Sequence, residues 1–365
     1  MQGRTKVVFI IHALSQPRCI KRVVSLQQAG FECVVYGYNR GNYDVNTFPD
    51  DICVHVLDRM ENGNSKNNFK IAIRHLNDII QENGKDCIYY TFGFLASFLI
   101  SFKKVSFIYE ISDILYAYPK YDKVRFLMKL LDKRIIRKAK YVVMTSGGFQ
   151  KFHGLNDEKV ILLPNKVSPV LMNVERHPIS YIEHKLRFAF VGAIRYDAIF
   201  RFAQTIGERF PDDEFHFYGG APERTLKRVR SLTDQYSNIY HHGPFKSPRD
   251  LSQIYNEVDV IVACYDTHSL NERIAEPNKL YESILFCRPL IVSEETYLAQ
   301  RVAEYGCGYA INPSSVDSIA SFVKSLTVRE LTAISENELH TDVKEIIYDA
   351  TQLINALNKL TYNNG

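Results

Sequence analysis

Short apolar runs alternate along the chain with segments in which apolar residues recur at helical spacing. The first run, residues 6–14, predicts a strand, and residues 20–29 follow with helical periodicity up to Gly30, a suitable helix C-cap. A second apolar run begins at Phe31. Because consecutive parallel strands need a crossover connection, usually a helix, this pattern predicts a β-α-β beginning.

The same alternation continues through the first half of the chain and starts again in the second. In the first half it predicts strands over residues 51–57, 87–91, 105–111 and 141–145, and helices over 68–82 and 121–140. In the second half it predicts strands over 186–195, 214–218, 239–243, 258–264 and 290–292, and helices over 199–210, 251–257, 317–325 and 342–360. Since 365 residues are many for one core, we expect an α/β protein with two Rossmann-like domains.

Residues 276–293 combine a predicted helix, a stop signal and a buried strand. Pro277 suits the first turn of a helix, and the helix is expected to end before Pro289. Lys279 lies in the first turn, where the helix dipole disfavours a cation unless an anion lies nearby. Glu282 follows one turn later, so the pair suits a nucleoside diphosphate, with the cation for phosphate and the carboxylate for ribose hydroxyls. A plain surface Lys–Glu pair is the simpler interpretation.

The run from Glu282 to Pro289 resembles the nucleotide-sugar signature of GT-B glycosyltransferases of the large retaining family 4. This resemblance implies a GT-B fold, with two Rossmann-like domains facing across an interdomain cleft, and it implies Glu282 for the ribose hydroxyls. The chain departs from the family pattern twice. Ile274 stands where many members have a second Glu, with Glu272 and Glu276 on either side, and Cys287 stands where a Gly usually ends the helix.

The resemblance also implies domain limits and the remaining site residues. The first domain is expected over 1–168 and the nucleotide-sugar domain over 169–341, with the C-terminal helix 342–365 packing back on the first. Arg195 and Lys279 are expected to stabilise the leaving diphosphate, and Asp113 to face the donor or acceptor sugar. The expected donor-binding set is Gly192, Gly219, Gly243, Glu276, Asn278 and Glu282, and the expected acceptor loop contains Ser15 and Arg18.

Several of these residues have a simpler structural interpretation. Arg18 is as well explained as a local cap, and Asp113 as a helix N-cap. Glu110, three residues before Asp113, is the weaker functional candidate of the two. The glycines at 219 and 243 allow the backbone to approach a flat ligand.

Charge is distributed unevenly along the chain. Residues 1–170 contain 25 Lys and Arg against 15 Asp and Glu, a balance of +10, whereas residues 171–365 contain 20 against 26, a balance of −6. Without a nucleic-acid motif, the basic half favours an anionic membrane surface or a lipid-linked acceptor. The basic segment 121–140 is the main candidate for contact with an anionic membrane surface. It also has an apolar stripe that would normally pack on the sheet (Val124, Leu127, Leu131, Ile135, Ala139). The aromatic segment 92–104 is a second candidate, equally explicable as a buried helix.

Composition limits the remaining classes. Seven scattered cysteines without a C-x-x-C pair favour free thiols in a reducing compartment, so we expect a cytoplasmic protein, peripheral at the inner face of the plasma membrane. The longest apolar run, residues 92–102, is too short to span a bilayer. No G-x-G-x-x-G follows the first strand and no D-x-D motif occurs, so neither a dinucleotide cofactor nor a metal is expected.

The function implied is transfer of a hexosyl group from a UDP- or GDP-sugar to a hydroxyl acceptor, with retention, in bacterial surface polysaccharide assembly. Two alternatives remain. One is a nucleotide-sugar 2-epimerase on the same fold, which the basic first half disfavours. The other is a non-catalytic binding subunit, which the missing Glu at position 274 keeps open.

Overall fold

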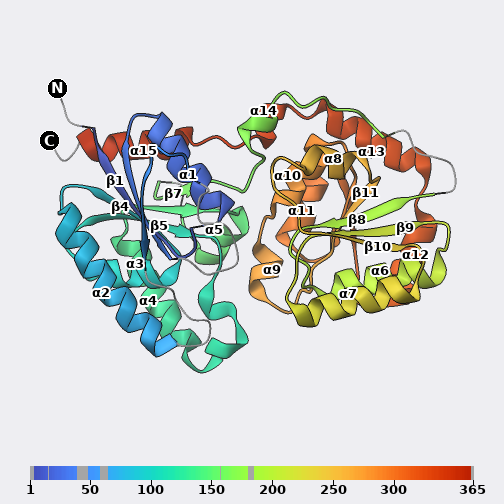
Figure 1. The fold of residues 1–365 in the computed structure, drawn as a ribbon, viewed down its shortest axis with the longest axis horizontal. Helices are drawn as coiled ribbons and strands as arrows, with labels where there is room; N and C mark the ends of the chain where they lie inside the picture. The colour runs from blue at the N-terminus through green and yellow to red at the C-terminus, as the bar shows by residue number, and fades with distance from the viewer. Residues whose placement is uncertain are drawn as a thin grey trace. The chain divides into compact units, whose positions relative to one another are not determined.

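The computed structural model describes residues 4–14, 16–38, 48–57, 65–156, 158–179 and 185–362. The chain divides into two compact units. Unit 1 comprises Met1–Pro164 and Asp349–Gly365, and unit 2 comprises Asn165–Tyr348. Each unit is built on one parallel sheet flanked by helices (Figure 1).

Unit 1 contains a seven-stranded parallel sheet with the order β3-β2-β1-β4-β5-β6-β7. Its strands are β1 (Lys6–Ile11), β2 (Glu32–Tyr38), β3 (Cys53–Leu57), β4 (Ile88–Phe92), β5 (Ser106–Ile111), β6 (Tyr141–Met144) and β7 (Val160–Leu162). Its α-helices are α1 (Pro17–Gln28), α2 (Ser65–Asn83), α3 (Phe94–Ile100), α4 (Arg125–Lys138), α5 (Gly147–His153) and α15 (Thr351–Tyr362). Strand order reverses between β1 and β4, and ligands of open α/β sheets bind at such switch points, beyond the carboxyl ends of the strands.

Unit 2 contains a six-stranded parallel sheet with the order β10-β9-β8-β11-β12-β13. Its strands are β8 (Arg187–Val191), β9 (Glu214–Tyr218), β10 (Ile239–Gly243), β11 (Val260–Ala263), β12 (Leu290–Ser293) and β13 (Gly308–Ile311). Its helices are α6 (Asp197–Arg209), α7 (Glu223–Gln235), α8 (Leu251–Asn256), α9 (Leu270–Ile274), α10 (Asn278–Leu285), α11 (Tyr297–Tyr305), α12 (Val316–Ser325), α13 (Val328–His340) and α14 (Val343–Ile346). Here the order reverses between β8 and β11.

The central strands of both sheets are buried on both faces, as the near-continuous apolar runs predict. In β8 and β9, Phe188, Phe190, Phe215 and Phe217 are fully buried and pack with Phe202 of α6. Burying a Phe side chain stabilises a fold by roughly 1.5–3 kcal/mol, so this aromatic cluster anchors β8 and β9. The loops at the carboxyl ends of these strands therefore begin from rigid positions.

The division into units differs from the expected domain limits because of one bridge. The Val167 N–H donates to the Ile346 carbonyl (3.0 Å), and the Tyr348 N–H donates to the Val167 carbonyl (2.8 Å), which ties both segments into unit 2. The single helix predicted over 342–360 is wrong for the same reason. Helix α14 ends at this bridge, and α15 starts after Asp349, whose carboxylate accepts the Thr351 N–H (2.9 Å).

Candidate donor-binding site

Three glycines lie at the carboxyl ends of neighbouring strands in unit 2. The Gly192 N–H donates to the Tyr218 carbonyl, and the Gly219 N–H donates to the Gly243 carbonyl, both at 2.8 Å. Gly219 has a φ of +150°, and a Cβ there would lie 1.8 Å from the Gly192 carbonyl oxygen. Glycine at 219 is therefore required by the close approach of two backbones, independently of any ligand. At Gly243 (φ +77°) no heavy atom lies within 4 Å of such a Cβ, so only the backbone conformation favours glycine there.

Lys279 extends from the first turn of α10 towards the Gly192 loop. A Cβ on Gly192 would lie 2.7 Å from the Lys279 ammonium nitrogen, which also lies 5.0 Å from the centre of the Phe190 ring. Burial lowers the pKa of Lys279 below the ordinary value, Arg195 lowers it further and the Glu282 carboxylate opposes both. Within the described ranges no carboxylate lies within ion-pair distance of this ammonium group. A poorly solvated cation at a helix N-terminus is suited to receive an anionic ligand.

Glu282 lies one turn further along α10 and is almost fully buried. Its Oε2 accepts a hydrogen bond from the hydroxyl of Tyr255 (2.9 Å), a fully buried residue at the end of α8. The Tyr255 ring stacks on Phe286, which fixes the direction of the hydroxyl. Sequence reasoning missed Tyr255, because 27 residues separate it from its partner and only the fold brings the two together.

Arg195 lies in the loop after β8, beside two tyrosines. Its guanidinium group is exposed, donates to the Tyr196 hydroxyl (2.6 Å) and lies over the Tyr196 ring. The Tyr196 ring packs on Tyr265, which follows β11 on the other side of the switch point (4.4 Å between ring centres). Arg195, Lys279 and Glu282 thus meet at the reversal of strand order, where the fold favours a ligand.

The N-terminus of α6 is already occupied by a side chain of the protein. Asp266 accepts the N–H groups of Asp197 (2.7 Å) and Ala198 (3.1 Å). This carboxylate takes the place that a phosphate could otherwise take at that helix end. This helix N-terminus is therefore engaged within the protein, and in this part of unit 2 the side chains of Arg195 and Lys279 carry positive charge.

Glu276 is engaged within the protein. Its Oε1 accepts the Tyr281 hydroxyl and forms an ion pair with Nε of Arg301 on α11 (3.2 Å). This arrangement ties the start of α10 to α11. Asn278, the first residue of α10, is exposed. Glu272, the other acid near position 274, has one buried carboxylate oxygen for which the described residues offer no hydrogen-bond partner.

The end of α10 shows why the chain tolerates a cysteine where the resembling family has glycine. Cys287 has a φ of +54°, its N–H donates to Ile284 O (3.3 Å), and the Arg288 N–H donates to Ser283 O (2.9 Å). This is a Schellman motif with a non-glycine residue in the left-handed position. That conformation costs an L-residue about 1–2 kcal/mol. Arg176 donates to the Ile284 and Leu285 carbonyls (3.1 Å each), which satisfies the end of the helix.

In unit 1, Arg18 lies in a buried ionic cluster at the start of α1. The fully buried Glu110 receives Arg18 at one oxygen (3.2 Å) and the fully buried Arg22 at the other (3.3 Å). Two guanidinium groups share one carboxylate, so the cluster keeps one positive charge. Arg18 also donates to Gln16 (2.9 Å), which supports its interpretation as a structural residue of this loop.

The other two unit 1 candidates are placed as follows. Asp113 is exposed after β5 and accepts the Tyr118 hydroxyl (2.6 Å). Ser15 lies outside the described residues. Since Asp113 and Arg18 belong to unit 1, they remain expectations for the acceptor side.

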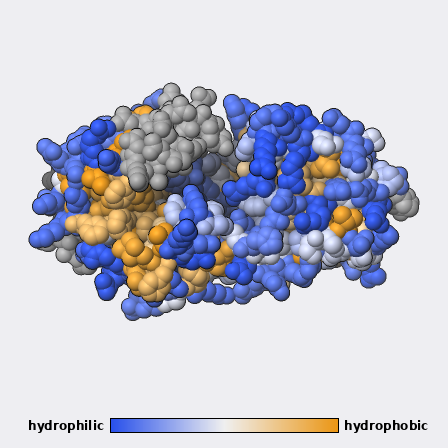
Figure 2. Space-filling model, turned by 90° about the horizontal axis from the view of Figure 1, so that it is seen from below, coloured by the Kyte–Doolittle hydropathy of each residue, from blue (hydrophilic) through white to orange (hydrophobic). Residues whose placement is uncertain are grey.

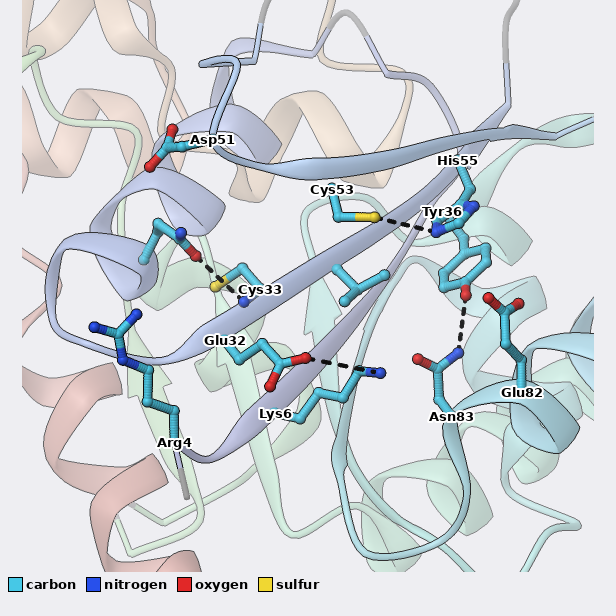
Figure 3. A pocket seen from close by; sticks show the side chains of 12 residues that line it. Arg4, Lys6, Glu32, Cys33, Tyr36, Asp51, Cys53, His55, Glu82 and Asn83 are labelled. Carbon is cyan, nitrogen blue, oxygen red and sulfur yellow. Dashed lines mark hydrogen bonds and ion pairs between the residues drawn. The ribbon is translucent and has the colours of Figure 1, made fainter. Parts of the chain in front are cut away.

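A separate pocket of about 420 Å³ lies in unit 1 against β2 and β3 (Figure 3). Its lining mixes polar and apolar surface and includes Lys6, Glu32, Cys53 and His55, with the Cys53 sulfur 3.3 Å from His55 Nε2. None of the predicted site residues lines it. Among the described residues no cluster of three or more His, Cys, Asp or Glu is arranged to hold a metal ion, and all seven cysteines are free.

No protein-family model and no curated protein sequence matches this chain. Solved structures do match, over almost the full length. Sucrose-phosphate synthase from Thermosynechococcus elongatus has a TM-score of 0.75 at 12% identity, with 99% of each chain covered. HepE from Anabaena, in complex with UDP and glucose, has a TM-score of 0.72 at 12% identity, covering 99% of this chain and 100% of that one. WaaG, a glycosyltransferase involved in lipopolysaccharide biosynthesis, has a TM-score of 0.65 at 16% identity, covering 93% and 97%.

These matches agree with the two parallel sheets of seven and six strands. They confirm the fold class predicted from the sequence: this chain has the GT-B fold, and in structure it resembles the glycosyltransferases that share that fold.

Proposed function

We propose that this protein is a glycosyltransferase that transfers a sugar from a nucleoside-diphosphate sugar to a hydroxyl acceptor. The observation that carries the proposal is the position of Lys279. Its half-buried ammonium group lies against Gly192 at the switch point, one helical turn from Glu282. This spacing suits a diphosphate and a ribose of one ligand, the ligand class of UDP, with which HepE was crystallised.

The chemistry requires charge stabilisation at the leaving group. As the bond between the sugar and the diphosphate breaks, negative charge develops on the phosphate oxygen, and Arg195 and Lys279 supply positive charge there. The acceptor hydroxyl loses its proton as it attacks, and the departing phosphate oxygen takes that proton on the same face of the sugar. This route gives retention without a nucleophile from the protein. In this scheme Asp113 faces the sugar, and Ser15 and Arg18 belong to the acceptor loop.

The finer proposal concerns the acceptor. The balance of +10 over residues 1–170 supports an acceptor carried on an anionic lipid, and hence a hexosyltransferase of surface polysaccharide assembly, peripheral to the inner face of the plasma membrane.

Nuclear magnetic resonance of the product tests retention, because the anomeric configuration of donor and product must then agree. An inverted product contradicts the proposed route.

Calorimetric titration tests donor recognition. The wild type should bind UDP or GDP more tightly than the matching monophosphate, because only the diphosphate reaches both cations. Lys279→Ala should remove that advantage and weaken diphosphate binding about ten- to hundredfold, the range for a lost hydrogen bond to a charged group. Lys227→Ala, an exposed lysine of α7, is the matched control and should bind as the wild type does. Equal diphosphate affinity in the Lys279 and Lys227 variants would contradict the assignment.

A further inference from the structure

The first two turns of α4 present large apolar side chains to solvent. Phe126 is 77% exposed, Leu127 56% and Leu130 48%, and Val124 just before the helix is also exposed. Phe102, which follows α3, is 55% exposed. We call these five residues the apolar face. Single exposed apolar side chains are ordinary, but a contiguous group of this kind marks an interaction surface.

The sequence-based expectation for this segment is only half right. The stripe of Val124, Leu127, Leu131, Ile135 and Ala139 was expected to pack on the sheet as a whole. Ile135 and Ala139 are buried, but Val124 and Leu127 are exposed. The helix is held at its second half, where Asp132 is buried and accepts the hydroxyls of Tyr109 (2.9 Å) and Tyr116 (3.0 Å). Its first half is left to present the apolar residues.

The apolar face continues from α4 onto α3. The Arg134 guanidinium group lies 4.8 Å from the centre of the Phe102 ring, and Lys138 donates to the Ser101 carbonyl (2.9 Å). Phe98 packs edge-on against Phe102, and α3 in turn packs on α2, which exposes Phe69 and Ile73. Figure 2 shows a hydrophobic area on unit 1 in the view from below, the side on which Figure 1 shows α2 and α4.

The exposed side of α4 changes from apolar to basic along its length. At 100° per residue, positions 126, 127 and 130 lie on the same side of the helix as positions 133, 134, 137 and 138, which are Lys, Arg, Arg and Lys. Residues 120–140 contain nine Lys and Arg against two Asp, and one of those, Asp132, is on the buried side. A basic surface beside exposed Phe and Leu is typical of helices that lie in the interface of an anionic bilayer.

We propose that the apolar face inserts into the interfacial region of an anionic phospholipid bilayer, with the basic turns of α4 on the headgroups. The charge selects this occupant over a second copy of the chain, because two copies would bring like charges together. Among the described residues no helix is long and apolar enough to cross a bilayer. The proposed attachment combines insertion with charge, rather than resting on a solvated basic face alone.

This inference deepens the peripheral membrane attachment in the proposed function, on which it rests, and it concerns unit 1 only. Its test uses lipid binding and fluorescence, whereas the donor site in unit 2 is tested by nucleotide binding. Failure of one therefore leaves the other to be judged by its own measurement.

The chain contains no tryptophan, so one introduced tryptophan reports on one position. We expect the emission of Phe126→Trp to move to shorter wavelength with vesicles of equimolar phosphatidylglycerol and phosphatidylcholine, and to be quenched by lipids brominated in the acyl chain. Val170→Trp is the control, at a position 73% exposed in unit 2, and its emission should not change. An unchanged Phe126→Trp spectrum with anionic vesicles overturns the proposal.

Vesicle sedimentation separates insertion from charge. The double variant Phe126→Ser/Leu127→Ser keeps every charge and should bind anionic vesicles at least about tenfold more weakly than the wild type. Lys133→Glu/Arg137→Glu should lose the preference for anionic over pure phosphatidylcholine vesicles, while the control Lys227→Glu keeps it. Wild-type affinity in the serine variant overturns insertion. A Phe126→Trp shift that follows protein concentration without lipid identifies a second copy as the occupant and also overturns the proposal.

Discussion

The ribose assignment of Glu282 is best tested by changing the protein and the ligand together. Glu282→Gln keeps the size of the side chain and an oxygen that can accept the Tyr255 hydroxyl, but it removes the negative charge. If the carboxylate accepts the 2′- and 3′-hydroxyls, the variant should bind the preferred nucleoside diphosphate less tightly. It should bind the dideoxy form of that nucleotide as the wild type does.

The expected magnitude follows from the burial of the carboxylate. Glu282 is almost fully buried, so its hydrogen bonds are screened little by water. A hydrogen bond to a charged group contributes about 1.5–3 kcal/mol, or about ten- to hundredfold in affinity. We therefore expect Glu282→Gln to lose that much binding free energy for the ribonucleotide and almost none for the dideoxy form. The difference between the two losses is the coupling energy between the carboxylate and the ribose hydroxyls.

Isothermal titration of both ligands with both proteins supplies the four affinities. Thermal unfolding of the variant is the control for the fold. Tyr255→Phe should give a smaller loss for the ribonucleotide, since it removes only the group that orients Glu282, and it should lower stability because a buried carboxylate loses a partner. Equal losses for the ribonucleotide and the dideoxy form in Glu282→Gln would refute the assignment, since the residue would then act on some other part of the ligand.

Three further predictions concern the structure around the site and the role of metals. Gly219→Ala should lower the unfolding temperature by several degrees or prevent folding, because the new Cβ meets the Gly192 carbonyl; Gly30→Ala, whose Cβ meets nothing within 4 Å, should cost only backbone strain. Burial raises the pKa of Asp132 to about 6 and lowers that of His153 to about 4. In His153→Gln the remaining acid should make the free energy of unfolding fall as the pH rises from about 4 to 6. In Asp132→Asn the remaining histidine should make it rise as the pH rises from about 4 to 6.5. Each change should reach up to about 2–3 kcal/mol, and the same pH dependence of unfolding in both variants would contradict both predictions. Transfer activity should survive EDTA, and strict dependence on Mg²⁺ or Mn²⁺ would count against Arg195 and Lys279 as the charge-stabilising groups.

Periodicity was sufficient to predict much of the sheet framework. The predicted strands 214–218 and 239–243 have the observed bounds of β9 and β10, and the helix that carries Lys279 and Glu282 lies between Pro277 and Pro289, as expected. These elements are dictated by local pattern, which explains why the α/β class could be predicted before the structure. The shorter elements β7, β13 and α9 lack enough periodic positions to be recognised.

Partners distant in the chain could not be predicted in the same way. Glu276 was expected among the donor-binding residues, and its ion-pair partner Arg301, which lies 25 residues later, could not be predicted. Asp266 reaches the N-terminus of α6 from 69 residues away. The half-exposed stripe of α4 could not be recognised either, because periodicity shows which residues share a face and not how far the sheet extends beneath them.

Release of nucleoside diphosphate from sugar donors tests the central claim most directly. The wild type, incubated with a panel of UDP- and GDP-sugars without acceptor, should slowly release the nucleoside diphosphate and free sugar from one donor. Lys279→Ala and Glu282→Gln should reduce that rate at least about tenfold, and Lys227→Ala should leave it unchanged. Two results would contradict the account. One is conversion of the donor to an epimer. The other is a protein that binds the nucleotide but neither releases it from any donor nor transfers sugar to any hydroxyl acceptor.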